Sequence, residues 1–443
     1  MTKQKLIFLI LWLLLLWAIF LLVINLRNSW GPQRNITPGD LSIWIYEDSE
    51  DDFKKIVDAF KNSVSGYSSK NIEISSFENL SSYEDSLASA LLAEKGPDIF
   101  MLRSWHYMTA ENATQVIARE YISPNDFRSR AHPFIAEELI FTDSDDRAQE
   151  YVIGVPLWYE TLWVLYNRRY FTKPSEMTQW GLFLQNIQKV LNRPGNITPI
   201  ALWNGSGVSR VADVIASLFV SDGVTWISSA ASSQIRQALT FYKAFWEQSG
   251  DNGYNETYSS RMQEVDIDAF TSWEVAAMVW FPRDIQKIDR IGYQSNFLFA
   301  SPFPKYEGQD SWQHVRVNSL SLNTNSQNKS LAQEFLAFIA SREWQSEIQK
   351  ALPYYIPAYS SLQEEILEEK IYPQYNIVYK NFLSKEARYT TFNMKNETLF
   401  RTKIANILDM ERWYEWAFES LKSFITCSHQ KIAFQQNLSS SCR

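Results

Sequence analysis

The sequence predicts a mixed α/β fold that follows an N-terminal transmembrane helix. Three observations support this prediction: an unbroken apolar run near the start, a long alternation of apolar strands with amphipathic helices, and a hydrophobic content of 45% in 443 residues. Strands that alternate with helices are typical of sheets covered by helices. The apolar content excludes wholesale disorder, and the length allows two or three units of about 100–200 residues each.

The first element is the apolar run Leu6–Ile24, whose 19 residues are long enough to span about 30 Å of hydrocarbon. Lys3 and Lys5 precede it and favour a cytoplasmic stub at 1–5 with the rest of the chain outside. A cleaved signal peptide would have a shorter apolar core and a small-residue cleavage site. We therefore predict an uncleaved signal anchor over 6–26; a signal peptide cut at an unobvious site is the alternative.

The globular region begins after a linker at 27–38 that contains proline and glycine. Residues 41–46 alternate like a strand, and Phe53, Ile56 and Phe60 then recur at helical spacing. This order predicts a mainly parallel sheet covered by helices. Further strands are expected at 71–74, 99–102, 151–155, 161–166, 200–203, 276–280, 297–300 and 319–323. Helices are expected at 83–92, 175–191, 211–220, 233–248 and 330–339, with a mainly helical region from 341 to a last helix at 402–424.

Composition excludes several function classes. The net charge of −8 argues against nucleic acid as the main partner. Four scattered histidines and two cysteines form no metal-binding spacing, and no glycine-rich phosphate loop or known catalytic motif is present. We therefore expect no catalytic residue, no metal and no cofactor. Cys427 and Cys442 could form a disulfide in an extracytoplasmic tail at 427–443, with two free thiols as the alternative.

Four ordered stretches carry a resemblance to a known family: Leu41–Ile45, Lys95–Phe100, Ile153–Asn167 and Asp268–Met278. As a set they resemble the extracellular solute-binding proteins of ATP-driven (ABC) importers, the sugar-binding type that includes maltodextrin-binding proteins. The likeness runs from about residue 41 to residue 424.

The resemblance implies a two-lobed periplasmic-binding-protein-like fold that closes by a hinge around a solute. It implies one lobe at 39–157 and 303–345, and a second at 158–302 and 346–426. The expected function is a membrane-anchored, non-enzymatic component that binds a carbohydrate or similar polar solute and presents it to the permease subunits of the importer. The alternatives are a ligand-sensing ectodomain with a membrane partner, and a glycoside hydrolase that uses paired carboxylates.

Polar and aromatic residues just past strand ends are the candidate solute contacts. Carboxylates, amides and arginine bind hydroxyl groups, aromatic rings pack against the apolar face of a sugar, and ligands bind at the carboxyl ends of strands. Glu160 matches a sugar-contacting position of the maltodextrin type, with a structural ion pair as the alternative. Core packing is the alternative for Trp105 and Trp280. The candidates are Tyr46, Asp48, Arg103, Trp105, Tyr159, Glu160, Trp203, Asn204, Trp280 and Tyr355.

Overall fold

The computed structural model divides the chain into two compact units, residues 1–99 with 325–332 and residues 100–324 with 333–443. The described residues are 40–46, 50–63, 67–77, 79–104, 113–142, 149–171, 178–193, 195, 197–202, 205–225, 232–245, 265–284, 288, 298–305, 312–352, 355–363, 388–391, 397–409 and 421.

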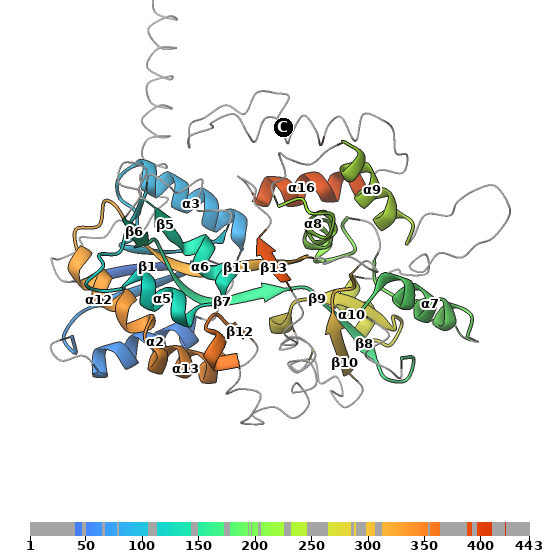
Figure 1. Ribbon diagram of the computed structural model, residues 1–443, viewed down its shortest axis with the longest axis horizontal. Helices are drawn as coiled ribbons and strands as arrows, with labels where there is room; N and C mark the ends of the chain where they lie inside the picture. Colours follow the sequence, from blue (N-terminus) through green and yellow to red (C-terminus); the bar gives the residue numbers. More distant parts are fainter. Residues whose placement is uncertain are drawn as a thin grey trace, which may run out of the picture. The chain divides into compact units, whose positions relative to one another are not determined.

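The first unit is built from two strand–helix pairs, as the sequence predicts (Figure 1). Strand β1 pairs in parallel with β2, from Leu41 opposite Ile72 to Tyr46 opposite Phe77. Helix α3 begins earlier than predicted because the Asn79 side chain caps it, accepting a hydrogen bond from Ser82 N at 2.9 Å. The elements are β1 (Leu41–Tyr46), α2 (Glu50–Ser63), β2 (Ile72–Phe77) and α3 (Leu80–Leu92).

A buried carboxylate holds this unit to its second chain segment, 325–332. Asp98 is only 3% exposed, and its Oδ2 accepts from the backbone N of Ser42 at 2.8 Å and from its Oγ at 3.0 Å. The other oxygen accepts from Ser326 Oγ at 2.6 Å and from Asn328 Nδ2 at 3.5 Å. Asp98 therefore joins β1 to a segment more than 200 residues further along the chain.

The main sheet of the second unit is organised around one long strand, β11. Strand β7 pairs with it antiparallel, and β12 pairs antiparallel with the other edge of β7. Strand β3 and the short strands β4 and β13 also pair with β11. The strands are β3 (Ile99–Arg103, in this unit from Phe100), β4 (Thr114–Gln115), β7 (Val155–Thr161), β11 (Trp312–Asn323), β12 (Ile356–Pro357) and β13 (Arg388–Thr391).

The prediction of a mainly parallel sheet is wrong for this unit. The chain leaves the main sheet at the end of β7 and enters it again at the start of β11, after residues 162–311. The two strands are antiparallel neighbours. The predicted break between the strands at 151–155 and 161–166 is also wrong, because β7 runs through Pro156 to Thr161. The β7–β11 register shifts at this point and leaves Leu157 as an extra residue. A proline without an N–H is tolerated at such a bulge.

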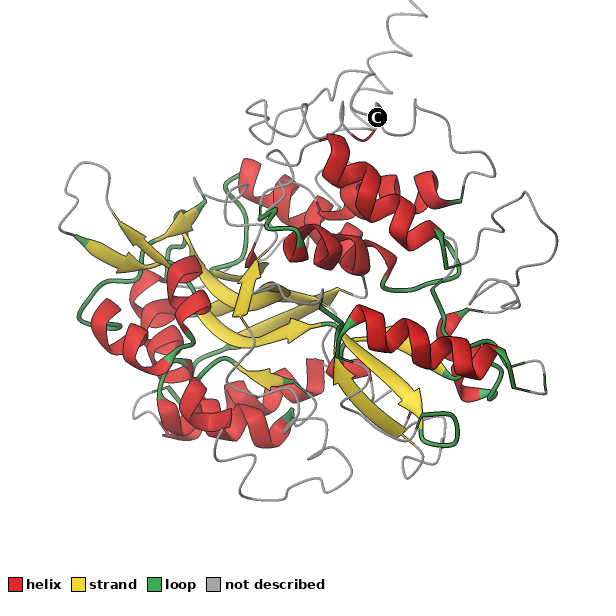
Figure 2. Ribbon diagram, turned by 45° about the vertical axis from the view of Figure 1, so that its right-hand side comes forward, coloured by secondary structure: helices red, strands yellow, loops and turns green. Residues whose placement is uncertain are grey.

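A smaller antiparallel sheet has the strand order β10-β8-β9, and α7 lies beside it (Figure 2). The predicted strand at 200–203 is represented by a single parallel bridge from Ala201 to Met278. A hairpin of β5 (Ile140–Thr142) and β6 (Glu150–Val152) completes the strands of the described part. The small sheet consists of β8 (Trp163–Asn167), β9 (Ala277–Trp280) and β10 (Leu298–Pro302).

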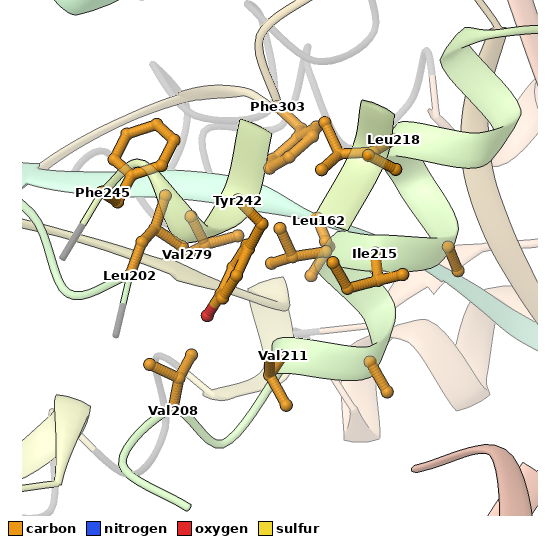
Figure 3. Packing of buried hydrophobic residues seen from close by; sticks show 14 of the residues in the cluster. Leu162, Leu202, Val208, Val211, Ile215, Leu218, Tyr242, Phe245, Val279 and Phe303 are labelled. Carbon is orange, nitrogen blue, oxygen red and sulfur yellow. The ribbon is translucent and has the colours of Figure 1, made fainter. Parts of the chain in front are cut away.

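The core of the second unit surrounds helix α8, whose residues are all buried (Figure 3). Ile215 and Leu218 of this helix belong to the same cluster as Leu162, Tyr242 and Phe303. A helix that is largely apolar and buried on every side is typical of a core position. The helices are α5 (Pro124–Arg130), α6 (Pro133–Leu139), α7 (Trp180–Leu191), α8 (Val211–Ser221), α9 (Ser232–Lys243), α10 (Asp266–Thr271), η4 (Pro282–Asp284), α12 (Lys329–Ile339), α13 (Arg342–Ala351) and α16 (Glu397–Leu408).

The C-terminal region is less helical than predicted, because β12 and β13 lie within it. In the part of the chain that the structure describes, no helix combines the length and the apolar character needed to cross a membrane. The predicted anchor at 6–26, the linker at 27–38 and both cysteines, Cys427 and Cys442, lie outside the described residues.

Replacing Asp98 by alanine should destabilise the protein by about 3 kcal/mol, because it leaves several buried donors without an acceptor. Urea unfolding followed by circular dichroism measures this change. Asp85→Ala, at an exposed position of α3, is the matched control and should cost less than about 0.5 kcal/mol. Equal losses in the two variants would contradict the role given to Asp98.

Candidate functional site

One face of the β12–β7–β11 ladder carries a row of polar and aromatic side chains. Glu160 lies opposite Arg316, and Trp158 lies opposite Asn318. Because side chains alternate along a strand, these four share one face. Tyr355, just before β12, joins them, with its ring centroid 4.3 Å from that of Trp158. We call these five residues the polar face.

Arg316 is the centre of this face and is completely buried. Its Nη2 donates to Glu160 Oε2 at 2.8 Å, and its Nη1 lies 3.2 Å from Asp213 Oδ1. The second oxygen of Glu160 lies 2.7 Å from Nε of Arg283, on η4. Arg401, on α16, donates to both oxygens of Asp213 at 2.8 and 3.0 Å. We call these five residues the ion cluster.

Electrostatic effects act on both the carboxylate of Asp213 and the guanidinium of Arg316. Asp213 lies in the first turn of α8, where the positive end of the helix dipole stabilises a carboxylate. Burial lowers the pKa of Arg316, and the nearby charge of Arg103 lowers it further, whereas Asp213 and Glu160 raise it again. Breaking a buried ion pair by removal of one partner is strongly unfavourable. The ion cluster therefore ties β7, β11, α8, α16 and η4 to one another.

An aromatic ring completes the surroundings of Arg316. Its guanidinium carbon lies 4.0 Å from the centroid of the Phe281 ring, and that of Arg210 lies 4.8 Å from the same centroid. Asp284 holds Arg210 through contacts of 2.8 and 3.1 Å. The segment after β9 therefore contributes three groups within four residues: the ring of Phe281, the cation of Arg283 and the anion of Asp284.

Trp158 supplies a buried hydrogen-bond donor, the N–H group of its indole ring. The residue is 1% exposed, and among the described residues its Nε1 has no hydrogen-bond partner. A buried donor without an acceptor costs about 1–3 kcal/mol. An oxygen atom of a bound solute would satisfy this donor, next to the aromatic surface of Tyr355.

The structure brings three of the sequence-predicted residues into this region. Glu160 and Tyr355 lie on the polar face. Arg103 is buried on β3, the neighbour of β11, and its charge acts on Arg316. Glu160 forms the ion pair that was the alternative to solute binding.

Three other candidates lie elsewhere. Trp280 is 2% exposed, and its Nε1 donates to Asp266 Oδ2 at 2.8 Å, so it packs in the interior. Tyr46 is buried in the first unit, with its ring 4.7 Å from that of Tyr83. Tyr159 lies on the opposite face of β7 from the polar face. Asp48, Trp105, Trp203 and Asn204 lie outside the described residues.

The opposite face of β7 carries Tyr159, and two groups with shifted pKa values, His132 and Glu138, lie at the start of α6 and within it. The Tyr159 hydroxyl accepts from Gln363 Nε2 at 2.9 Å, and Gln363 also contacts Nε2 of His132. Burial lowers the pKa of His132 to about 4. On α6, Glu138 accepts from Thr391 Oγ1 at 3.0 Å, and burial raises the pKa of this carboxyl to about 7, although the hydrogen bond from Thr391 opposes the rise.

Sequence reasoning missed most of the ion cluster. A signal existed in β11, where His314, Arg316 and Asn318 alternate with valines and so predict one polar row in a buried strand. Asp213 and Arg401 have no local signal, because they meet across 188 positions of the chain.

The comparison with family models agrees with the resemblance inferred from the sequence. Residues 55–373, more than two thirds of the chain, match the bacterial extracellular solute-binding protein family. The chain belongs to this family. A comparison with curated proteins found no match. Membership makes the protein a non-enzymatic, extracellular solute-binding component of the ABC-importer type, so the glycoside hydrolase alternative is wrong.

Arg316→Met should destabilise the protein by about 3–5 kcal/mol, because it removes one partner from each of two buried carboxylates. Adding Glu160→Gln should recover part of this loss, since it removes one of the uncompensated charges. Urea unfolding of the single and double variants measures both effects. Lys350→Met, which breaks an exposed pair with Glu347, is the control and should cost under about 1 kcal/mol. Strictly additive losses at 160 and 316 would contradict the ion cluster.

The pH dependence of stability should split when His132 and Glu138 are changed separately. The raised pKa of Glu138 means that the folded state holds an extra proton, so its contribution falls as pH rises from about 4.5 to about 7. The lowered pKa of His132 means that its contribution rises between about pH 4 and 6.5. In the unaltered protein the two slopes oppose each other.

Urea unfolding at several pH values between 4.5 and 6.5 tests this balance. Relative to the unaltered protein, Glu138→Gln should make stability rise more steeply with pH, and His132→Asn should make it fall. If the two variants shift the slope of the unfolding free energy against pH in the same direction, or leave it unchanged, the pKa values given for Glu138 and His132 are contradicted.

Proposed function

We propose that the polar face binds the solute, and that the solute is a carbohydrate or a similar hydroxyl-rich compound. The observation that carries this proposal is the buried Nε1 of Trp158, which has no partner among the described residues and lies beside the Tyr355 ring. A solute that presents both an oxygen acceptor and an apolar C–H face suits this pair.

The remaining groups of the polar face suit the same chemistry. Glu160 is held by two arginines, so its carboxylate keeps a fixed position. Asn318 of β11 lies opposite Trp158 of β7, and its side-chain amide can donate to and accept from a hydroxyl group. Fixed directional groups next to aromatic rings are typical of small-molecule sites.

The proposed binding cycle uses the lobes expected from the family. With one lobe at 39–157 and 303–345 and a second at 158–302 and 346–426, Trp158 lies at the first crossing of the chain between lobes. Hinge closure around ligand is an established device of such proteins. Residues of the polar face would therefore contact the solute when the lobes close.

The proposed location is the outer face of the cell membrane. The segment 6–26 would act as the anchor, with the stub 1–5 inside and the linker 27–38 between membrane and binding domain. The permease subunits of the importer would then receive the solute from a tethered donor.

A thermal-shift screen over sugars, polyols, amino acids and peptides tests the proposal. A solute at about one hundred times its dissociation constant should stabilise the folded protein by about 2.7 kcal/mol and so raise its melting temperature. Sugars or polyols should give the shift. A broad carbohydrate set without any shift would rule out this solute class.

Trp158→Phe should weaken binding of the identified solute about tenfold, the loss expected for one hydrogen bond from a buried donor. Isothermal titration calorimetry measures the affinity. The matched control is Trp180→Phe, which removes a buried Nε1 that likewise has no described partner but lies in the apolar cluster of α7. Unchanged affinity for Trp158→Phe, or equal losses in both, would refute the site.

A further inference from the structure

Helix α13 carries two glutamines on its buried face. Gln345 and Gln349 are both buried, and their spacing places them on the same side of the helix, one turn apart. Ile348, on the same face, is the kind of apolar residue that such a position favours. Burying a side-chain amide is unfavourable unless its groups form hydrogen bonds. The partners of the two amides therefore show what the glutamines do.

Gln349 holds Tyr355, the aromatic residue of the polar face that precedes β12. Its Nε2 donates to the backbone oxygen of Tyr355 at 2.9 Å. The backbone N of Tyr355 donates to the oxygen of Leu352, the C-cap residue of α13, at 3.1 Å. Both main-chain groups of Tyr355 are therefore bound to this helix and its end. Strand β12 is only two residues long, and its Pro357 has no N–H for a ladder, so sheet pairing alone fixes this segment weakly.

Gln345 holds the segment that leads to Trp158. Its Nε2 donates at 3.0 Å to the backbone oxygen of Pro156, and at 3.0 Å to that of Ile339, the last residue of α12. Pro156 lies where the pairing of β7 with β11 shifts register. A bulge interrupts the ladder, so a donor from outside the sheet fixes the strand at this point. Trp158 follows two residues later on β7.

One helix therefore holds both chain segments that bring Trp158 and Tyr355 together. Figure 1 shows α13 beside β12, and the ring centroids of the two aromatic residues lie 4.3 Å apart. An apolar side chain at 345 or 349 would fill similar space without needing a partner. Buried amides whose hydrogen bonds are formed instead specify one arrangement of the groups that they join.

We propose that Gln345 and Gln349 are positioning residues of the solute site. They fix the rings of Trp158 and Tyr355 relative to each other and so set which solutes the polar face accepts. The glutamines act through these two residues and are not solute contacts themselves. Binding groups need to be held within about 0.5 Å of the productive geometry, which a two-residue strand and a bulge do not provide alone. This inference rests on the proposed function, since it takes the polar face as the solute site.

Nuclear magnetic resonance of the full chain, with isotope-labelled tryptophan, tests the positioning role without a solute. The indole N–H signal of Trp158 is the one that W158F removes, and Y355L shows how far it moves when the neighbouring ring is absent. Q345M and Q349M should each move this signal, because either change displaces one ring against the other. If both leave it in place, the proposal is overturned. If Y355L also leaves it in place, the two rings are not in contact and the proposal is again overturned.

Q333M is the matched control, because Gln333 on α12 also binds a backbone group of the same unit. Its Oε1 accepts from the N of Ala118 at 2.7 Å. Q333M should lower the urea midpoint much as Q349M does, and it should leave the Trp158 signal in place. A merely structural role for Gln349 would lower the midpoint without moving that signal. Equal movement of the signal in Q333M and Q349M would show general loosening and would also overturn the proposal.

Isothermal titration calorimetry tests the effect on binding, with the sugar that most raises the melting temperature of the unaltered protein as the probe. Q349M should weaken its binding about fivefold, whereas Q333M should leave the affinity within about twofold. Unchanged affinity in Q349M would refute its role in the solute site. If no sugar raises the melting temperature, the proposed function fails. The Trp158 signal then still decides whether the glutamines position the two rings.

Discussion

The guanidinium of Arg316 is the group on which the second unit most depends. It is completely buried, and it contacts Glu160 on the neighbouring strand and Asp213 at the start of the buried helix α8. Arg283 and Arg401 hold the far sides of those two carboxylates. Because each charge inside the protein is tolerable only while its partners stay in place, this cluster constrains five elements at once.

Because of this constraint, the side chains of the polar face are positioned by ion pairs as well as by packing. Replacing all members of a buried ion pair by apolar residues of similar volume often leaves a protein just as stable. What the ion pairs specify is register: Glu160 must lie opposite Arg316, and Trp158 then lies opposite Asn318. The bulge at Leu157 accommodates Pro156. The register that pairs Trp158 with Asn318 holds on the other side of this bulge. The side chains of this face are therefore positioned in part by the ion pairs of Glu160 and Arg316.

Local patterns in the sequence were enough to predict β1, α2, α8 and β9. The apolar residues of α2 recur at helical spacing, whereas α8 and β9 are largely apolar. They were not enough for the antiparallel return of β11, which depends on where the chain comes back after 162–311. Glu160 was predicted as a site residue from the family resemblance, but its partners Arg283 and Arg316 lie more than 120 positions away. Trp280 is the last residue of β9, at the strand end as predicted, yet its indole N–H donates to Asp266 inside the unit. Pairings between distant segments carry no local signal.

A crystal structure of the protein with its solute bound, after a screen has identified that solute, tests the proposed site most directly. If the polar face binds the solute, a solute oxygen will lie within about 3 Å of Trp158 Nε1 and the solute's apolar face will lie against the Tyr355 ring. A solute bound elsewhere, with no acceptor for Trp158 Nε1, would contradict the proposal that the polar face is the binding site.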